Sequence, residues 1–410
     1  MPENQLPFAG LKVIDCASYI AAPAAATMLS DFGAEVLKIE PPEGDPLRVL
    51  WRIPGAPPAN SNYPWELDSR NKRSLVLDLK QPAAQAVLQR LVSQADVFIT
   101  NMPLPVRARL GIGHAALCAL NPRLVYASMT AYGETGPEAD KTGFDATAYW
   151  ARSGLMDLIR PDHTAPPARA VAGIGDHPSA VSLYAAIVTA LYRRLTNGAG
   201  GVVSTSLLAN GLWANGTQVQ AHLSGAKYPP RPPRSHSPNP FGNVYRCRDG
   251  RWLNLVLLNA PRQGQALADA LGQPRLLDDP RFATQAAREQ HHVELIAVMD
   301  ACFAQRDLAE WRARLDGAGI TFGVVGTLSD IDGDAQMRAC GALVPWADGQ
   351  GTTIASPIQI DGLRQRSASP APALGQHSAE LLREAGFSQA DIISLAASGA
   401  VARATTLSKE

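Results

Sequence analysis

The sequence has 410 residues, of which 46% are hydrophobic and 18% are charged. A chain of this size and composition can bury one large core or two ordinary ones, and it lacks the composition of a disordered protein, so we expect two lobes. Lysine plus arginine and aspartate plus glutamate both number 37, and a formal net charge of +0 creates no long-range field. Nucleic acid and anionic membrane surfaces are therefore not expected as partners, and an anionic ligand must be held by local groups.

The beginning of the chain, MPENQLPFAGLKVIDCA, has acidic and polar residues where a signal peptide needs a basic segment and then an apolar run. The longest apolar tract, residues 180–192, is too short to cross a bilayer. We therefore expect a cytoplasmic protein without a membrane span. The five cysteines form no CxxC pair, and no clustered histidine and cysteine ligands occur, so no metal site is expected.

Strand and helix patterns alternate along the first part of the chain. Apolar runs predict strands over 11–17, 34–40, 74–80, 96–100 and 124–130, and helical spacing predicts helices over 22–33, 81–95 and 114–120. Strands that read as continuous apolar runs between helices favour a parallel sheet covered on both faces. With right-handed crossovers, this predicts an α/β fold of the doubly wound, Rossmann-like kind.

A long helix is predicted from His177 to the glycine at 198, followed by a strand and another helix. Residues 228–240 contain six prolines, which predicts a linker or the wall of a binding site. Beyond it, two strands around Asp249-Gly250 predict a hairpin that opens a smaller α+β lobe. The predicted domains are the first part of a large domain, a helix with a proline-rich linker, a small domain, and a linker returning to the large domain, over 1–205, 206–240, 241–335 and 336–410.

Nucleotide-binding fingerprints are missing, since the sequence has neither a GxxxxGK[ST] loop nor a GxGxxG that follows a strand. Cationic and amide side chains nevertheless lie near predicted strand ends, among them Lys38, Lys80, Asn101 and Arg109. Ligands of open α/β sheets bind beyond the carboxyl ends of the strands, and a phosphate-bearing ligand would require such groups there. Taken alone, such charges are more often part of a solvated surface than of a binding site.

The turn Gly173-Ile174-Gly175-Asp176-His177-Pro178 precedes the long predicted helix. Asp176 suits a helix N-cap and Pro178 suits a first helical turn, which is a purely structural interpretation. The same geometry also suits chemistry, because a helix N-terminus favours an ionised, nucleophilic carboxylate and flanking glycines allow a bulky thioester to approach the backbone. The residues alone leave both interpretations open.

In its ordered motifs the chain resembles the class III CoA-transferases, which include formyl-CoA transferase, and the related alpha-methylacyl-CoA racemase. The resemblance covers nearly the whole chain and is carried by GLKVID (10–15), DFGAEVLKIE (31–40), GDP (44–46), NKRS (71–74), NPRLVY (121–126), GETGP (133–137), GFD (143–145) and the Gly175-Asp176 turn. It implies a split Rossmann-like large domain, a small domain joined by linkers, and an interlocked homodimer.

The resemblance also implies that Asp176 is the nucleophile and that coenzyme A (CoA) lies along the strand ends. The residues implied to contact CoA are Ile20, Ala21, Pro41, Leu77, Lys80, Asn101, Met102, Pro103, Arg109, Thr142, Phe144 and Asp145. No cofactor is implied to stay bound, because CoA and acyl-CoA are substrates. Ile20 stands where formyl-CoA transferase has a glutamine, and residues 235–242 lack its glycine-rich loop, which argues against formyl or oxalyl substrates.

The implied reaction moves CoA from an acyl-CoA donor, such as succinyl-CoA, to a small acid through aspartyl anhydride and aspartyl-CoA intermediates. Acids such as 3-sulfinopropionate, itaconate or malate are expected acceptors, and Arg48, Arg169, Arg231 or Arg234 could bind a second anionic group. The alternative is an alpha-methylacyl-CoA racemase, although Phe144 stands where the racemase has its catalytic histidine. A CoA-binding protein without activity is a third hypothesis.

Overall fold

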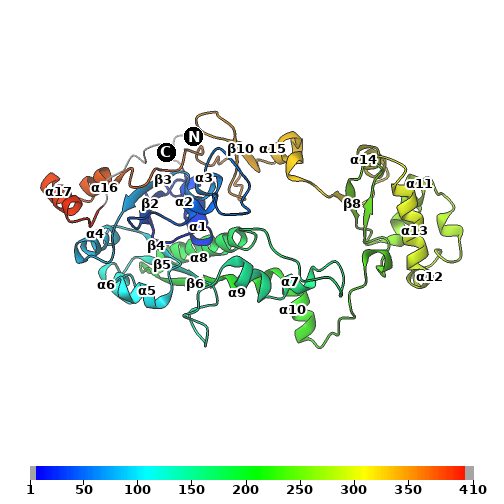
Figure 1. Ribbon diagram of the computed structural model, residues 1–410, viewed down its shortest axis with the longest axis horizontal. Helices are drawn as coiled ribbons and strands as arrows, with labels where there is room; N and C mark the ends of the chain where they lie inside the picture. Colours follow the sequence, from blue (N-terminus) through cyan, green and yellow to red (C-terminus); the bar gives the residue numbers. More distant parts are fainter. Residues whose placement is uncertain (1–5, 402–410) are drawn as a thin grey trace. The chain divides into compact units, whose positions relative to one another are not determined.

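The structure is a computed structural model that describes residues 6–401. The chain forms two compact units, of which the larger contains the residues up to Leu158, Arg169–Ser224 and the residues from Ala335 onwards. The smaller unit contains Ile159–Ala168 and Gly225–Asp334. The sequence colouring of Figure 1 follows the chain from the larger unit into the smaller one and back. The four domain ranges and the interlocked homodimer inferred from the sequence stay predictions.

A six-stranded parallel sheet forms the centre of the larger unit, in the order β3-β2-β1-β4-β5-β6. This is the doubly wound order, in which the strands are added toward one edge of the sheet up to β3 and toward the other edge from β4 onwards. The strands are β1 (Lys12–Asp15), β2 (Glu35–Glu40), β3 (Lys72–Val76), β4 (Val97–Thr100), β5 (Val125–Thr130) and β6 (Gly201–Ser206). The α/β fold with a Rossmann-like parallel sheet is therefore confirmed.

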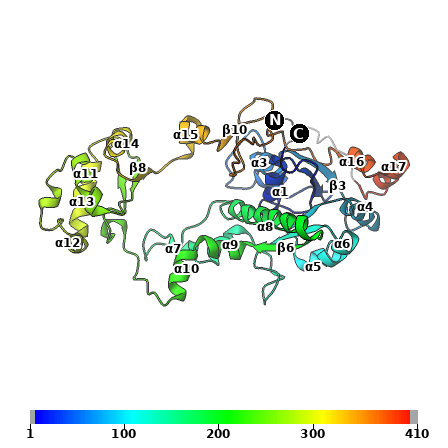
Figure 2. The ribbon, with the colours of Figure 1, turned by 180° about the vertical axis from the view of Figure 1, so that it is seen from behind.

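Neighbouring residues of β1 point into two different cores, because successive side chains of a strand face opposite sides of the sheet. Val13 packs against α1 (Ala21–Asp31) and α8 (Asp176–Asn197), which lie side by side in both ribbon views (Figures 1 and 2). Ile14 packs on the other face, in the core that includes residues of α4 (Pro82–Val92), α6 (His114–Leu120) and α16 (Ser378–Glu384). Both faces of the sheet are thus covered, which explains the continuous apolar runs in the sequence.

The larger unit contains further helices. They are α2 (Leu47–Leu50), α3 (Tyr63–Ser69), α5 (Leu104–Arg109), a π-helix (Asp145–Ala151), α7 (Leu155–Leu158), α9 (Leu207–Ala214), α10 (Gly216–Leu223), α15 (Ala335–Ala339) and α17 (Gln389–Ala397). No helix within residues 6–401 is both long and apolar enough to cross a membrane.

The third strand begins and ends earlier than the sequence indicates. We expected a strand over 74–80, but β3 ends at Val76, and Leu77 forms an isolated antiparallel bridge with Val401. The next residues turn away from the sheet because the Asp78 carboxylate accepts a hydrogen bond from the Lys80 amide. Apolar residues at 77 and 79 gave a strand-like pattern, while the aspartate between them forms the turn that ends the strand.

Buried ion pairs connect the first three strands. The Lys38 ammonium lies 2.8 Å from Asp45 and 3.6 Å from Asp15, and the Lys72 ammonium lies 2.9 Å from Asp15. Lys72 also donates to the Asp68 carbonyl, which fixes the end of α3 against the sheet. Buried charges are tolerated only when they are paired. This network therefore fixes how β1, β2, β3 and the loop that contains Asp45 are arranged.

The C-terminal segment returns to the larger unit and covers the edge of β3. The His377 amide donates to the Ser74 carbonyl, and the His377 ring accepts from the Ser74 amide. A covered edge cannot pair with another chain. A short hairpin, β10 (Leu343–Pro345) and β11 (Thr352–Ile354), precedes this segment.

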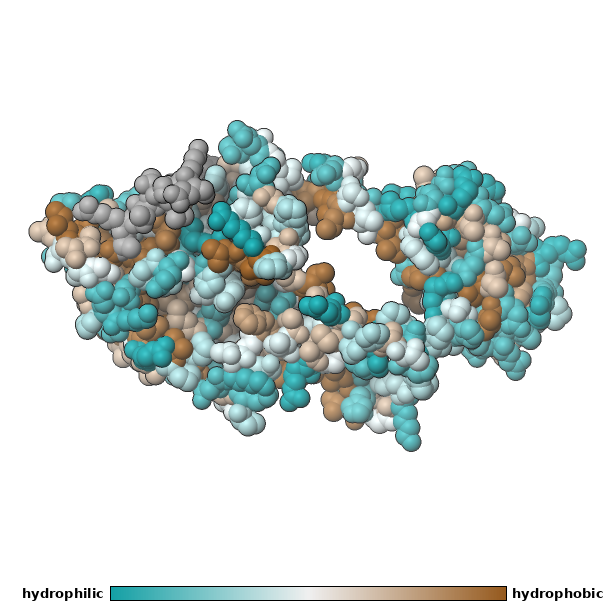
Figure 3. All heavy atoms as spheres, in the orientation of Figure 1, coloured by the Kyte–Doolittle hydropathy of each residue, from teal (hydrophilic) through white to brown (hydrophobic). Residues whose placement is uncertain are grey.

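The smaller unit contains a three-stranded antiparallel sheet, β7 (Val244–Arg246), β8 (Trp252–Leu255) and β9 (Phe322–Val324). Its main helices are α11 (Ala260–Ala270), α12 (Gln285–Gln290), α13 (His292–Phe303) and α14 (Leu308–Gly317). The expected hairpin with its turn at Asp249-Gly250 and the α+β character are confirmed. On the face shown in Figure 3, hydrophilic residues cover much of this unit. The proline-rich segment is not wholly irregular, since Arg234–His236 forms a short 3-10 helix.

Candidate active site

A large hollow of the larger unit lies at the carboxyl ends of β1, β4 and β5 and has a volume of about 780 Å³. The loops that follow these strands line it, together with the beginning of the π-helix and the beginning of α8. The strand order reverses between β1 and β4, which is where open α/β sheets bind their ligands. The hollow therefore has the position of a substrate site.

Asp176 lines this hollow as the first residue of α8. The N-cap of the helix is Gly175, and no side chain caps the helix through a hydrogen bond. The interpretation of Asp176 as the helix N-cap is therefore wrong, because the helix begins at Asp176, one residue earlier than that interpretation requires. Its half-buried carboxylate lines the hollow and does not cap the helix.

Two glycines give the turn before α8 its shape for steric reasons. Gly173 has a φ of +80°, a conformation that residues with a side chain rarely adopt. Gly175 is packed against the ring of Tyr149, and a Cβ atom at this position would lie 2.5 Å from the Cγ of Tyr149. The glycine beside Asp176 is thus required by the tyrosine behind it, a contact that the sequence did not reveal.

Burial and the negative charges of Asp145 and Asp68 together raise the pKa of the Asp176 carboxyl from 3.8 to about 7, while the neighbouring His177 opposes the shift. We had expected the helix N-terminus to keep this group ionised. Removal from water and the two nearby carboxylates instead favour the protonated form of this carboxyl. A carboxylate that titrates near neutral pH is a better nucleophile than an ordinary aspartate, because its basicity is higher.

Asp145 lies at the beginning of the π-helix and lines the same hollow. Its carboxylate accepts hydrogen bonds from the amide of Ala146, at 2.7 Å, and from the amide of Gly175, at 3.2 Å. The residue is 6% exposed. Asp145 therefore fixes the backbone immediately before Asp176 in addition to lining the hollow.

The loop after β1 is held in place by polar contacts on both sides. The Asn101 side chain accepts from the Ser18 amide at 2.9 Å and donates to the Ser18 carbonyl at 2.7 Å. Tyr19, at a φ of 65°, donates its amide to Asp45, and its ring meets the ring of Phe144 edge to face at 5.5 Å. Phe144 is 57% exposed, so this aromatic pair presents an open apolar surface to the hollow.

A second hollow of about 100 Å³ lies at the carboxyl ends of β1 and β2 and shares Ser18 and Met102 with the first. The two hollows bring together most residues that the resemblance implied for CoA. The large one contains Ile20, Ala21, Asn101, Met102, Pro103, Thr142, Phe144 and Asp145, and the small one contains Pro41, Leu77, Lys80 and Met102. Arg109 lines neither hollow and is exposed at the end of α5.

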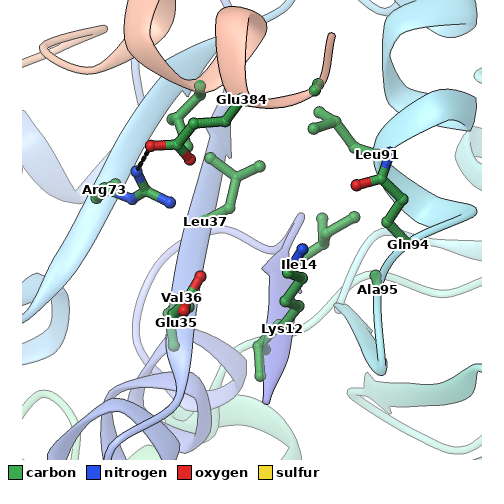
Figure 4. Close-up of a pocket in the computed structure, with 13 residues that line it drawn as sticks. Lys12, Ile14, Glu35, Val36, Leu37, Arg73, Leu91, Gln94, Ala95 and Glu384 are labelled. Carbon is green, nitrogen blue, oxygen red and sulfur yellow. Dashed lines mark hydrogen bonds and ion pairs between the residues drawn. The ribbon is translucent and has the colours of Figure 1, made fainter. Parts of the chain in front are cut away.

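A third hollow lies at the opposite edge of the sheet, where Lys12 and Glu35 begin their strands (Figure 4). The ion pair between Arg73 and Glu384, 2.8 Å long, lies at its border. Its volume is about 90 Å³, which is too small for an acyl-CoA. The amino ends of parallel strands are also not where such sheets bind ligands.

The cations proposed for a second substrate carboxylate lie in different places. Arg48 binds the buried carboxylate of Glu40 at 2.6 Å, outside the large hollow. Arg231 and Arg234 belong to the smaller unit, and Arg234 is paired with Asp300. Arg169 alone among the four lines the hollow that contains Asp176.

Arg169 is exposed and has no ion pair with another residue of the range 6–401. Lys141, which also lines the hollow, is bound by Glu138 at 2.9 Å. Arg169 is therefore the cation of this hollow that is available to an anionic ligand. Its sequence context, a segment without regular pattern, gave no reason to prefer it over the other arginines.

Sequence reasoning missed the contact between His177 and Asp68, whose Nε2 and Oδ1 atoms lie 3.0 Å apart. The two residues are 109 positions apart, so no motif connects them. Within residues 6–401, no group of three or more histidine, cysteine, aspartate or glutamate side chains is arranged to hold a metal ion.

The chain is similar to known CoA-transferases over most of its length. Residues 8–378 match the model of CoA-transferase family III. The chain is 31% identical to the (R)-2-hydroxy-4-methylpentanoate CoA-transferase of Clostridioides difficile, over 93% of this chain and 96% of that protein. It is 30% identical to the succinyl-CoA:glutarate CoA-transferase of Mus musculus, over 93% of this chain and 87% of that protein.

Among solved structures, the chain is similar to a CAIB/BAIF family protein from Brucella suis, with a TM-score of 0.82 and 29% identity. The match covers 93% of this chain and 99% of that one. The similarity thus includes both compact units and is not confined to the parallel sheet.

Proposed function

The chain belongs to CoA-transferase family III, and we propose that it transfers CoA from an acyl-CoA donor to a small carboxylic acid through Asp176. The observation that carries this proposal is the Asp176 carboxylate itself. It is half-buried, it does not cap its helix, and it lines a hollow large enough for the reacting end of an acyl-CoA. These are the features that a carboxylate nucleophile requires.

In the first half-reaction, a carboxylate oxygen of Asp176 attacks the thioester carbonyl, the carbon–sulfur bond breaks, and CoA leaves as a thiolate. The resulting aspartyl-acyl anhydride is attacked by the thiolate at the aspartyl carbonyl, which releases the donor acid and leaves an aspartyl-CoA thioester. The acceptor carboxylate then repeats both steps in reverse. Each thioester is exchanged for another, so no nucleotide hydrolysis is needed, in agreement with the missing P-loop.

Coenzyme A is proposed to lie along the two hollows at the carboxyl ends of the strands. The small hollow, near Pro41 and Lys80, would hold the end of CoA that is remote from the thioester, and Met102 would lie between the hollows. The thioester would then reach Asp176 past Phe144. Arg109, which is exposed at the end of α5, stays a proposed CoA-binding residue.

For the acyl group we propose acids with a second anionic group, with succinyl-CoA as donor and malate, itaconate or 3-sulfinopropionate as acceptor. Arg169 supports this choice, since an unpaired guanidinium in the reaction hollow can bind a carboxylate or sulfinate with two parallel hydrogen bonds. The mouse relative is named for succinyl-CoA and glutarate. The Clostridioides difficile relative is named for a 2-hydroxy monocarboxylic acid, so monocarboxylates are the competing substrate class.

A screen of acyl-CoA donors against mono- and dicarboxylic acids, read by mass spectrometry, tests the proposal. Asp176→Ala should abolish exchange, and hydroxylamine should trap the wild-type enzyme charged with donor as an aspartyl hydroxamate. Asp361→Ala, at an exposed aspartate of the larger unit, is the matched control and should keep full activity. Full transferase activity in Asp176→Ala would refute Asp176 as the nucleophile.

The second candidate is a racemase or epimerase of 2-methylacyl-CoA esters. A racemase needs a base that removes the proton from the alpha carbon of the acyl group. Phe144 lines the hollow at the position of the racemase histidine, and a phenylalanine side chain cannot act as that base. We expect no deuterium at the alpha carbon when the enzyme is incubated with donor in heavy water without an acceptor acid. Exchange under those conditions would favour the racemase, whereas CoA binding without turnover across the acid panel would favour a binding protein.

A further inference from the structure

We propose that His177 is a positioning residue, held as an imidazolium by Asp68, which fixes the turn before α8 and places a positive charge beside Asp176. The inference rests on the proposed function of Asp176 and adds a residue that shapes its reactivity. His177 follows Asp176 directly on α8, so its ring comes from the same first helical turn as the nucleophile.

The ring of His177 lies between the Asp68 carboxylate and the turn at Gly173. Its Nε2 atom lies 3.0 Å from the Asp68 carboxylate, and the backbone of Gly173 also contributes to raising the pKa of the ring. The Nδ1 atom is the ring nitrogen nearest Gly173, 3.5 Å from the place where a Cβ of that glycine would be. The Asp68 carboxylate only accepts, so Nε2 donates to it, and a protonated ring adds the attraction of an ion pair to that hydrogen bond.

Asp68 is well placed to hold that cation. Its side chain is 4% exposed, and its backbone carbonyl accepts from Lys72 at 2.7 Å and from Thr27 at 2.6 Å. The ammonium of Lys72 lies against the carboxylate of Asp15, so it is already paired. A buried carboxylate without a cation is costly, and His177 is the ion-pair partner of Asp68 within the described residues.

The charges around Asp176 give this cation a role. Asp145 and Asp68 raise the pKa of the Asp176 carboxyl, and His177 is the neighbour that lowers it. Arg169 and Lys141 line the same hollow, but Lys141 is paired with Glu138. Burial lowers the pKa of the His177 ring, yet the hydrogen bond and charge of Asp68 and the charge of Asp176 raise it above its ordinary value.

A positive ring next to the nucleophile favours each charged species of the proposed reaction. It favours the Asp176 carboxylate that attacks, and it favours the negative oxygen that forms when a thiolate or carboxylate adds to the aspartyl carbonyl. The side chain of His177 is 45% exposed, so its role is not simply to fill the core. The contact with Gly173 also connects the ring to the turn whose shape positions Asp176.

His177→Gln tests the charge while keeping a side chain that can donate a hydrogen bond to Asp68. We expect the acid limb of the kcat/KM profile to move up by about one pH unit. Activity should then fall about tenfold at pH 6 and stay within about twofold of the wild type at pH 9. His292→Gln, on α13 of the smaller unit, is the matched control and should show the wild-type profile. An unchanged limb in His177→Gln, at an unchanged melting temperature, would overturn the inference.

A second measurement does not depend on activity. With histidine rings labelled with carbon-13, the signal that disappears in His177→Gln belongs to His177, and it should titrate above pH 6.5 in the wild type and at lower pH in Asp68→Asn. A neutral His177 ring at pH 6 would contradict the proposal. The role of Asp176 and the role of His177 can be refuted separately. Full activity in Asp176→Ala refutes Asp176 as the nucleophile. If Asp176→Ala is inactive but His177→Gln has the wild-type pH profile, only the role of His177 is refuted.

Discussion

Replacing Gly175 by alanine should damage both stability and activity, and the structure fixes the sign of the effect. At a φ of −97° and a ψ of −22°, Gly175 has a backbone conformation that alanine adopts freely. On backbone grounds alone, the substitution would stabilise the protein by about 0.4–1 kcal/mol, because it restricts the unfolded chain. The added methyl group, however, would lie 2.5 Å from Cγ, 2.7 Å from Cβ and 2.8 Å from Cδ1 of Tyr149.

Carbon atoms cannot approach so closely, so either Tyr149 or the turn must move. Tyr149 is 6% exposed and packs in the core with α8, which leaves its ring little room. Overpacking of this kind costs about 1–3 kcal/mol. Because Gly175 also donates its amide to Asp145, a displaced turn shifts Asp176, and a misplacement of about 1 Å can reduce the catalytic rate about a hundredfold.

Urea denaturation and the rate of CoA exchange measure the two effects. Gly216→Ala is the matched control, since Gly216 begins α10 and has no atom within 4 Å of an added Cβ. We expect the control to be as stable as the wild type or slightly more stable, with full activity. If Gly175→Ala unfolds at the same urea concentration as the wild type and keeps its activity, the contact with Tyr149 does not shape the site.

Three further predictions follow from charges in the larger unit. Because burial raises the pKa of Asp176 from 3.8 to about 7, the folded chain holds a proton that the unfolded chain has lost, and stability falls as the pH rises between these values. Asp176→Asn should therefore be more stable than the wild type at pH 8, by on the order of 2 kcal/mol in urea denaturation, and less so at pH 5. Arg169→Met should raise KM for a dicarboxylic acid about tenfold to a hundredfold and leave KM for a monocarboxylic acid unchanged, with Arg262→Met as the control; equal effects on both acids would exclude a second-carboxylate contact. Asp15→Asn should destabilise the larger unit by about 3–5 kcal/mol, because it leaves two buried lysines short of a partner, and a loss below 1 kcal/mol would show that the network is dispensable.

Much of the fold could be predicted from local patterns. The continuous apolar runs of β1, β2, β4 and β5 identified buried parallel strands, since both faces of the sheet are covered. The end of α8 was predicted from the glycine at 198, which adopts the left-handed conformation that ends the helix. The end of β3 could not be predicted in this way, because Leu77 pairs with Val401, a residue far along the chain.

The sequence by itself determined the α/β fold, the membership of a CoA-transferase family and the choice of Asp176 as the candidate nucleophile. The fold followed from the periodicity of apolar residues, whereas the family and the choice of Asp176 followed from the resemblance to the class III CoA-transferases. Only the tertiary structure decided that Asp176 does not cap its helix, that its pKa lies near neutrality, and that Arg169 is the arginine in its hollow. Desolvation and Coulomb interactions depend on which groups lie within a few ångströms of each other, and Asp68, Asp145 and His177 meet there from separate segments of the chain.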